Sequence, residues 1–385
     1  MGETGSGKST VALLKCEEYD EENVLSTVRR SVDLLGGMKT FVGNGQRVLL
    51  KVNLLRGDLP ERAITTHPAV VRAVTLLVQE AGGEVVIGDS PAGPNSVMLL
   101  RRAYKQSGYE RVAKETGASL NEDLSYGLVP CRGGHLIKEL DILNAVESAD
   151  VVIPLPKLKT HVLTGFTGAT KILFGVVPGV TKGAYHLKLK DVDQFSHMLL
   201  DIVAHVQAPL YIMDGVVAMH GDGPGAGDPF PVGAILAAAD PVAMDRTAVA
   251  LVGLVPDRVS TLTVAADRGM GPASLDDIDV LGDGLDAFSI TGFRPASATS
   301  KLGSRLPGIV RRFVLRQTVA SPYAGPKCIG CGVCAAACPV KAITITDKRA
   351  HMDLSTCIRC YCCHETCPEQ AVELDRPLLS RVLGW

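Results

Sequence analysis

The sequence predicts an α/β protein with a mostly parallel sheet and flanking helices, followed by a small α+β domain near the C-terminus. Two observations support this prediction. Apolar runs alternate with amphipathic segments from residue 10 to about residue 290, as they do where strands alternate with helices. Eight cysteines then follow in two matching runs between residues 328 and 367, which indicates a separate module with its own chemistry.

Strands of the large domain are expected where short apolar runs occur. These runs cover residues 11–15, 47–55, 84–88, 150–155, 210–214 and 232–238. Helices are expected between them, because capping residues mark where each could begin and end. The expected helices run from Asp20 to Gly36, from Pro68 to Gly82, over residues 191–207, and onward from Pro241.

Polar residues directly follow several of these strands. Lys51 and Asn53 follow the strand at 47–55, and Asp89 follows the strand at 84–88. Ligands of parallel α/β sheets bind beyond the carboxyl ends of the strands. We therefore expect Lys51, Asn53 and Asp89 to belong to a binding site at that edge.

Residues 151–190 contain no Asp or Glu, although they carry several cations. Cations without nearby carboxylates, on glycine-bearing loops, suit a pocket for a phosphate or a carboxylate. Lys157, Lys159 and Lys182 are predicted to bind the anion, while Lys171, His161 and His186 are predicted to be catalytic. The alternatives are a solvated basic face and a docking surface for an acidic partner.

The eight cysteines repeat one motif, C-x2-C-x2-C-x3-C-P, which ends at Pro339 and again at Pro368. This is the spacing of bacterial ferredoxins with two [4Fe–4S] clusters, in which the fourth cysteine of each run binds the other cluster. The module is therefore predicted to be a dicluster ferredoxin domain. Cluster 1 is assigned to Cys328, Cys331, Cys334 and Cys367, and cluster 2 to Cys357, Cys360, Cys363 and Cys338. Structural zinc and a disulfide framework are the alternatives, but zinc sites pair their CxxC knuckles at wider spacing.

Two residues within the second run are not assigned to a cluster. Cys362 is out of phase with the motif, so we interpret it as a packed or spare thiol. His364 is interpreted as a residue near the cluster or at the surface, because a cluster held by four thiolates needs no imidazole.

Residues 2–9 satisfy the P-loop pattern G-x-x-x-x-G-K-[ST]. A P-loop lies between a strand and a helix, because the helix N-terminus binds the phosphates. Here the following residues, 11–15, read as a strand. We therefore interpret residues 1–9 as a flexible leader and not as a nucleotide site.

Composition narrows the classes of function. The net charge is −2 and aromatic residues make up only 4% of the chain, so nothing indicates nucleic-acid binding. No apolar run is long enough for a transmembrane helix. Cysteines are concentrated in the two cluster motifs, which is typical of a reducing cytoplasm. Because exposed clusters degrade in oxygen, an anaerobic setting is expected.

Several segments of the large domain resemble the family called "domain of unknown function 362". They are Lys51-Val-Asn-Leu-Leu55, Thr66-His-Pro-Ala-Val-Val-Arg72, Gly88-Asp-Ser-Pro91, Lys157-Leu-Lys-Thr-His161, Ala169-Thr-Lys-Ile-Leu-Phe-Gly175, Val177-Pro-Gly179 and Ala239-Asp-Pro-Val-Ala-Met-Asp245. Members of this family are often fused to a C-terminal two-cluster ferredoxin module. The resemblance implies an α/β iron–sulfur protein and brings no defined reaction.

These observations divide the chain into five parts. Residues 1–9 form the leader, 10–290 the α/β domain, 291–322 a linker, 323–376 the ferredoxin domain and 377–385 a tail. Within the linker, residues 306–317 are compatible with a short basic amphipathic helix.

Two functions fit the sequence. The first is an oxidoreductase that passes electrons through two [4Fe–4S] clusters to an anionic substrate or cofactor in the α/β domain. The second is a non-catalytic electron carrier or assembly factor whose basic surface docks an acidic redox partner protein. In an oxidoreductase, His161, Lys171 and His186 should face one cavity, whereas docking would spread them over a convex surface.

Overall fold

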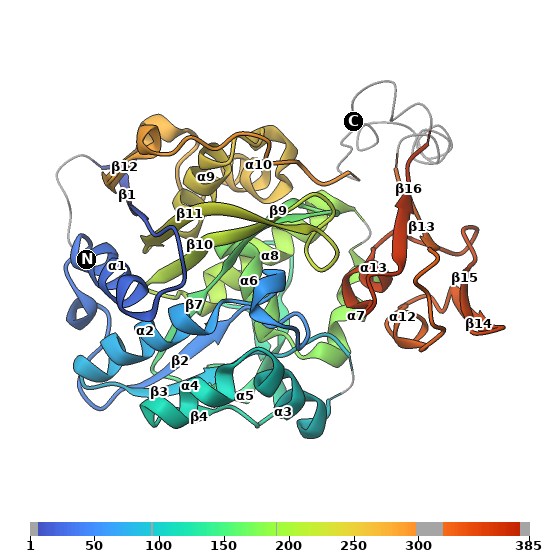
Figure 1. Cartoon of the computed structure of the whole chain (residues 1–385), viewed down its shortest axis with the longest axis horizontal. Coiled ribbons are helices and arrows are strands. Elements are labelled where there is room, and N and C mark those ends of the chain that lie inside the picture. Colours follow the sequence, from blue (N-terminus) through green and yellow to red (C-terminus); the bar gives the residue numbers. More distant parts are fainter. Residues whose placement is uncertain (1–6, 94, 190, 298–318, 378–385) are drawn as a thin grey trace.

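The computed structural model describes residues 7–93, 95–189, 191–297 and 319–377. Of these described residues, those up to 297 form an α/β domain, and those from 319 to 377 form a small iron–sulfur module. Figure 1 shows the module, in red, at one end of the large domain beside α7 (Gly179–Lys188). The helix expected at 306–317 lies outside the described residues, as do residues 1–6 and most of the tail.

The larger sheet has six strands in the order β12-β1-β11-β10-β8-β9. It is mixed, because β11 runs antiparallel to both of its neighbours, while β12 is parallel to β1 and β8 is parallel to β10. The strands are β1 (Ser9–Lys15), β8 (Lys157–His161), β9 (Gly165–Thr167), β10 (Tyr211–His220), β11 (Asp228–Ala238) and β12 (Ile278–Gly282).

A second sheet of four parallel strands has the order β4-β3-β2-β7. Its strands are β2 (Arg47–Val52), β3 (Glu84–Gly88), β4 (Ser119–Leu120) and β7 (Val151–Leu155), and β5 (Tyr126–Pro130) pairs separately with β6 (Glu139–Leu143). Pro156 connects β7 of this sheet directly to β8 of the larger one.

The α/β class is confirmed, but the expectation of one mostly parallel sheet is wrong. The predicted strands divide between two sheets, and only the smaller is parallel throughout. The connection between β10 and β11 covers residues 221–227. That length suits a hairpin and is too short for the crossover that parallel neighbours require, so β10 and β11 must be antiparallel.

The helices cover the faces of the sheets (Figure 1). They are α1 (Glu21–Asp33), α2 (Pro68–Glu80), α3 (Val97–Gln106), α4 (Tyr109–Thr116), α5 (Asn144–Glu147), α6 (Ala169–Ile172), α7, α8 (Val192–Val206), α9 (Pro241–Leu251) and α10 (Ser260–Asp267). Asp20, His67 and Asp191 are the N-caps of α1, α2 and α8, because the side chain of each accepts a backbone N–H of the first turn.

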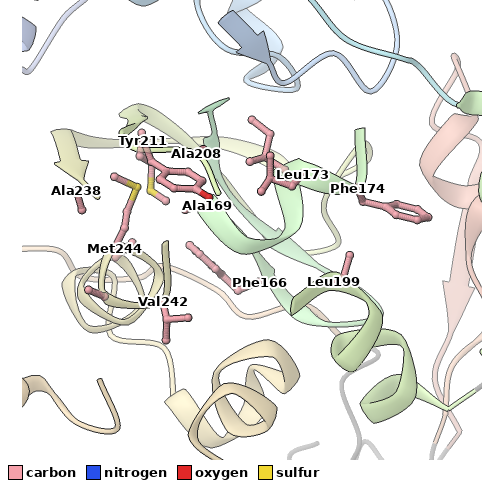
Figure 2. Packing of buried hydrophobic residues seen from close by; sticks show 14 of the residues in the cluster. Phe166, Ala169, Leu173, Phe174, Leu199, Ala208, Tyr211, Ala238, Val242 and Met244 are labelled. Carbon is pink, nitrogen blue, oxygen red and sulfur yellow. The ribbon is translucent and has the colours of Figure 1, made fainter. Parts of the chain in front are cut away.

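Alternating residues of the larger sheet pack on its two faces, as the twofold period of a strand requires. Val11 and Leu13 of β1 belong to one buried cluster, and Ala12 between them belongs to the other. Figure 2 shows part of the first cluster, where Tyr211 of β10 and Phe166 of β9 lie among residues of α6, α8 and α9. This core fixes β8 and α6, which carry the predicted site residues.

The start of the chain does not form a P-loop geometry in its described part. Ser9 already belongs to β1, and its hydroxyl donates a hydrogen bond of 2.8 Å to Asp240. Lys8 Nζ lies 3.9 Å from Oδ1 of Asp279 on β12. A strand therefore follows the Gly-Lys-Ser sequence where a P-loop would require a helix.

The iron–sulfur module is built from two short antiparallel pairs. β13 (Ser321–Ala324) pairs with β16 (Val372–Asp375), and β14 (Ile343–Thr346) pairs with β15 (Arg349–Met352). The short helices α12 (Val333–Ala336) and α13 (Cys362–Thr366) lie within the two cysteine runs. The small α+β domain expected from the repeat is present.

Candidate functional site

A cavity of about 1010 Å³ lies between the large domain and the iron–sulfur module. One wall is formed by the segments after β2 and β3, together with α6 and α7. The other wall is formed by α12, the residues around it, and α13. The charged and titratable side chains on the walls, other than cysteines, are Lys51, Arg56, Asp89, Lys159, Lys171, Lys182, His186 and Glu365.

Strand β8 carries three of the predicted site residues on one face. Lys157, Lys159 and His161 occupy alternate positions of the strand, and all three are buried. The glycine-bearing sequence predicts loops here, but residues 157–161 form a strand. Pairing with β10 and β9 holds this segment extended, so tertiary context overrides its low β-propensity.

Lys157, which was predicted to bind an anion, does not line the cavity. Its Nζ donates hydrogen bonds to Asp214 Oδ2 at 2.8 Å and to Tyr19 Oη at 2.6 Å. The Tyr19 hydroxyl donates to the other Asp214 oxygen at 2.8 Å. The charge of Lys157 is therefore neutralised within the protein, by a carboxylate far from it in sequence.

Lys51 and Asp89 form an ion pair at the carboxyl ends of neighbouring strands. Lys51 Nζ lies 3.0 Å from Asp89 Oδ1, and the Asp89 carboxylate accepts the backbone N–H groups of Leu54 and Ser90 at 2.7 Å each. Burial lowers the pKa of Lys51, although Asp89 opposes this shift. Gly175 packs against the pair so closely that a Cβ would collide with both side chains.

Lys159 is buried beside Asn53, which was also predicted to belong to the site. Its Nζ donates to Asn53 Oδ1 and to the Ile64 carbonyl oxygen, both at 2.7 Å. Among the residues that the structure describes, no carboxylate forms an ion pair or a hydrogen bond with this amine. Burial, together with the charges of Lys171, Lys157 and Arg56, holds the pKa of Lys159 well below its ordinary value.

Lys171 and Lys182 approach the same aromatic ring. Their Nζ atoms lie 6.0 Å and 5.8 Å from the centre of the Phe174 ring, respectively. Lys182 donates a hydrogen bond to the Ser90 carbonyl oxygen. Burial lowers the pKa of Lys171, and it lowers the pKa of Lys182 to about 8. Lys171 has neither a hydrogen bond nor an ion pair within the described parts of the chain, so its ammonium is free to bind a ligand.

The two predicted catalytic histidines differ in position. His186 lines the cavity and stacks on Phe195 with ring centres 4.6 Å apart. His161 lies behind the wall, and its Nδ1 accepts the backbone N–H of Leu163 at 3.0 Å. Burial lowers the pKa of each histidine to about 4, so both are neutral at pH 7.

Glu365 connects His161 to the cavity, and no pattern in the sequence marks it as a site residue. Because Nδ1 of His161 accepts a hydrogen bond, the proton of the neutral ring is on Nε2, which lies 3.2 Å from Glu365 Oε1. Neither atom has a hydrogen-bond partner of good geometry among the described residues. Burial alone would raise the pKa of Glu365, but His161, Lys171 and His186 together lower it to about 2.

The expected grouping is therefore present in part. Lys171 and His186 line one cavity, and His161 contacts it only through Glu365. The other predicted binding residues on the walls are Lys51, Asn53, Asp89, Lys159 and Lys182. A charge pattern in one stretch of sequence could suggest such a pocket, but it could not indicate Glu365, which comes from the other domain.

The cysteines gather in the crossed arrangement that the motif predicts. Cys328, Cys331, Cys334 and Cys367 line one small hollow of the module. Cys357, Cys360, Cys363 and Cys338 line a second hollow. Each set combines three cysteines of one run with the fourth of the other, as assigned to clusters 1 and 2.

Backbone amides near the thiols fit iron–sulfur clusters. Ala342 N donates to Cys338 Sγ at 3.2 Å, and Ala371 N donates to Cys367 Sγ at 3.2 Å. Arg359 N donates to Cys357 Sγ at 3.4 Å. Such hydrogen bonds stabilise negative charge on cluster sulfur and help to set the reduction potential. The residues present therefore fit two [4Fe–4S] clusters.

Arg56 fixes the iron–sulfur module against the large domain. Its guanidinium donates to the Glu365 carbonyl oxygen at 2.7 Å and to the Gly225 carbonyl oxygen at 2.8 Å. His364 Nε2 lies 3.0 Å from the Asp222 carbonyl oxygen, so this histidine also bridges the domains. The β10–β11 hairpin approaches α13 so closely that a Cβ on Gly225 would collide with it.

Residues 48–250 match the family model described as "Domain of unknown function (DUF362)", which is more than half of the chain. The chain belongs to this family. Residues 327–371 of this DUF362 protein match the model of a 4Fe-4S dicluster domain. It therefore carries two [4Fe–4S] clusters, and such a domain transfers electrons.

Two known proteins are similar to this DUF362 protein. The Thylakoid-associated protein sll1697 of Synechocystis sp. (strain ATCC 27184 / PCC 6803 / Kazusa) is 37% identical over 272 residues, which cover 69% of this chain and 81% of that protein. The lactate racemase apoprotein from Thermoanaerobacterium thermosaccharolyticum is a solved structure with 14% identity and a TM-score of 0.38. That match covers 62% of this chain and 58% of the racemase chain, and it carries no functional argument.

Within the ranges that the structure describes, no helix is long and apolar enough to cross a membrane.

Proposed function

We propose that this protein is an oxidoreductase that passes electrons through its two [4Fe–4S] clusters to an anionic substrate or cofactor in the interdomain cavity. One observation carries the proposal. The cavity is lined by Lys171 and Lys182 of the large domain and also by Cys331 and Cys338, which the motif assigns to different clusters. An anion held at the lysines would lie in the same cavity as residues that bind both clusters.

Charge in the cavity supports an anionic ligand. Five Lys and Arg side chains line it, against two carboxylates. Burying these Lys and Arg side chains is unfavourable while they are charged, and a bound anion would offset that cost. The clusters would supply electrons one at a time. His186 lines the cavity and would transfer the accompanying protons, and His161 would act behind it.

Burial argues against the alternative, an electron carrier or assembly factor that docks an acidic protein through these residues. Lys51, Lys159 and His161 are each at most 2% exposed, so they cannot form a convex docking surface. A redox partner protein is still required to deliver or accept electrons, and we propose that it docks elsewhere on the iron–sulfur module.

The test uses anaerobically purified protein with both clusters. Small molecules that co-purify with the protein are identified by mass spectrometry, and the reduced clusters are mixed with them while reoxidation is followed optically. Lys171→Met should abolish ligand-dependent reoxidation and leave the iron content unchanged. Lys39→Met, which changes an exposed lysine, is the matched control. Equal reoxidation of both variants would refute the role of the cavity.

We propose the cytoplasm as the location, since the cysteines of the chain are concentrated in motifs that need reducing conditions. The cyanobacterial relative carries a name that refers to thylakoids. Fractionation of cells into soluble and membrane extracts, followed by immunodetection, distinguishes a cytoplasmic protein from one attached to the surface of such a membrane.

A further inference from the structure

The cavity combines a cationic part with walls that are mainly apolar. We propose that its ligand is an amphipathic anion, with an acidic group at Lys171 and Lys182 and an apolar body that extends to the mouth of the cavity. This inference rests on the proposed function and names the class of substrate or cofactor that the cavity would take.

Lys171 and Lys182 are the cations best placed for the acidic group. Lys51 is paired with Asp89, and Lys159 already donates to Asn53 and Ile64. Lys171 keeps all of its donors free within the described ranges, and Lys182 uses one for the Ser90 carbonyl oxygen. Because both lysines approach the Phe174 ring, an acid between them would meet two ammonium groups.

The walls beyond these lysines are apolar on both sides. Leu54 and Leu55 lie on the large-domain side, and α12 contributes Ala336, with Ala337 and Pro339 beyond it. These side chains cannot satisfy a polar ligand body, whereas an apolar body would remove them from water. The apolar walls therefore select against a small, fully polar anion.

Exposed apolar side chains surround the mouth. Leu99 of α3 is 45% exposed, Val180 and Leu187 of α7 are 46% and 37% exposed, and Val333 of α12 is 40% exposed. All four also line the cavity. They come from three separate elements, so their meeting at one opening is a property of the tertiary structure. Exposed apolar side chains that line one cavity in this way mark a place where apolar ligand atoms bind.

The volume supports the same conclusion. Pockets for drug-sized ligands span roughly 300–1,000 Å³, and this cavity reaches about 1010 Å³. Acetate or inorganic phosphate would occupy a small fraction of it and leave the apolar walls in contact with water. A carboxylate or phosphate on a chain or ring system would fill it.

The test measures binding of the fatty-acid probe cis-parinarate to the full protein with both clusters, prepared anaerobically. Its fluorescence rises when it enters an apolar site. Decanoate, decanol, decyl phosphate, acetate and inorganic phosphate are then used as competitors. Decanoate or decyl phosphate should compete at least about tenfold better than decanol, acetate or inorganic phosphate. Decanol lacks the acidic group that the lysines bind, and the two small anions lack the apolar chain that the walls bind. The two long-chain acids distinguish a carboxylate from a phosphate ligand.

Substitutions of residues that line the cavity show whether parinarate binds there. Lys171→Met should weaken parinarate binding about tenfold and leave decanol binding unchanged. Val180→Asp and Leu187→Ser should weaken both. Lys39→Met and Leu128→Asp are the controls, because Lys39 is exposed and Leu128 is 61% exposed on β5, away from the cavity. Iron content shows whether each variant has folded.

The outcomes separate this inference from the proposed function. If acetate or inorganic phosphate competes as well as decanoate, the amphipathic class is wrong while an anion-binding cavity remains. If parinarate binds equally to all cavity variants, it binds elsewhere and the inference fails. If reoxidation of the clusters is also independent of Lys171, the proposed function fails with it.

Discussion

His161 on β8 and Glu365 on α13 meet across the boundary between the two domains, with Nε2 and Oε1 3.2 Å apart. His161 is fixed from behind by the backbone of residues 163 and 164. Glu365 is held in place by α13, and its backbone carbonyl oxygen accepts a hydrogen bond from the Arg56 guanidinium. The contact therefore couples the position of the iron–sulfur module to the wall of the cavity.

Glu365→Gln should loosen this contact. A neutral amide attracts the Nε2–H group of His161 less strongly than a carboxylate does, and it no longer offsets the charge of Lys171. We expect the free energy of unfolding to fall by about 1–3 kcal/mol. Hydrogen exchange should increase in β8 and α13 but not in β1. Glu369→Gln changes an exposed glutamate of the same module and should alter neither measurement. Unchanged exchange in Glu365→Gln would show that the contact does not hold the domains together.

Asp214→Asn should destabilise the large domain strongly. The substitution leaves the Lys157 ammonium fully buried without a carboxylate, and breaking such a pair costs about 3–5 kcal/mol. Urea unfolding followed by circular dichroism measures the loss. Glu122→Gln removes one partner of an exposed ion pair with Arg101 and should leave the transition unchanged. Equal midpoints for the two variants would contradict a structural role for the Lys157–Asp214 pair.

Local features of the sequence predicted the parts of the fold that depend on neighbouring residues. Asp20 and His67 cap helices because a capping side chain needs only the next few backbone N–H groups. The grouping of the module's cysteines into two sets was predictable because three members of each set lie within one short loop. In both cases the interaction that decides the structure spans a few residues.

Features that depend on distant residues could not be predicted in the same way. Lys157 was expected to bind a ligand because residues 151–190 contain no acid, yet Asp214 neutralises it from the neighbouring strand. The separation into two sheets depends on Pro156 leading from β7 to β8, and no local pattern marks this step. Tertiary contacts likewise decide which lysines can bind a ligand.

The ninth cysteine of the module tests the cluster assignment. Cys362 lines the interdomain cavity, whereas its neighbour Cys363 lies with the ligands of cluster 2. Cys363→Ser should lose or convert one cluster, so iron analysis should fall from about eight to about four irons per chain if that cluster is lost. Cys362→Ser should retain about eight irons. EPR of the reduced, anaerobic protein would show the same difference, and loss of iron in Cys362→Ser would overturn the assignment.

The affinity of the cavity for an anion should fall as the pH rises through about 8. Lys182, whose pKa burial lowers to about 8, binds an anion better when protonated, so its contribution is complete well below pH 8 and lost above it. The charged groups that act on it are Asp89, Lys51, Lys171 and Glu365. The neutral histidines do not titrate in this range, because their pKa values lie near 4.

Parinarate titrations between pH 6.5 and 9.5 would measure this loss, which we expect to be about tenfold. Lys182→Arg keeps its charge throughout and should bind with nearly constant affinity, since the pKa of a guanidinium stays far above this range. Lys182→Met should bind weakly at every pH. If Lys182→Arg lost affinity in parallel with the unmodified protein, the titrating group would be another residue, and Lys171, the other lysine beside Phe174, would be the next to substitute.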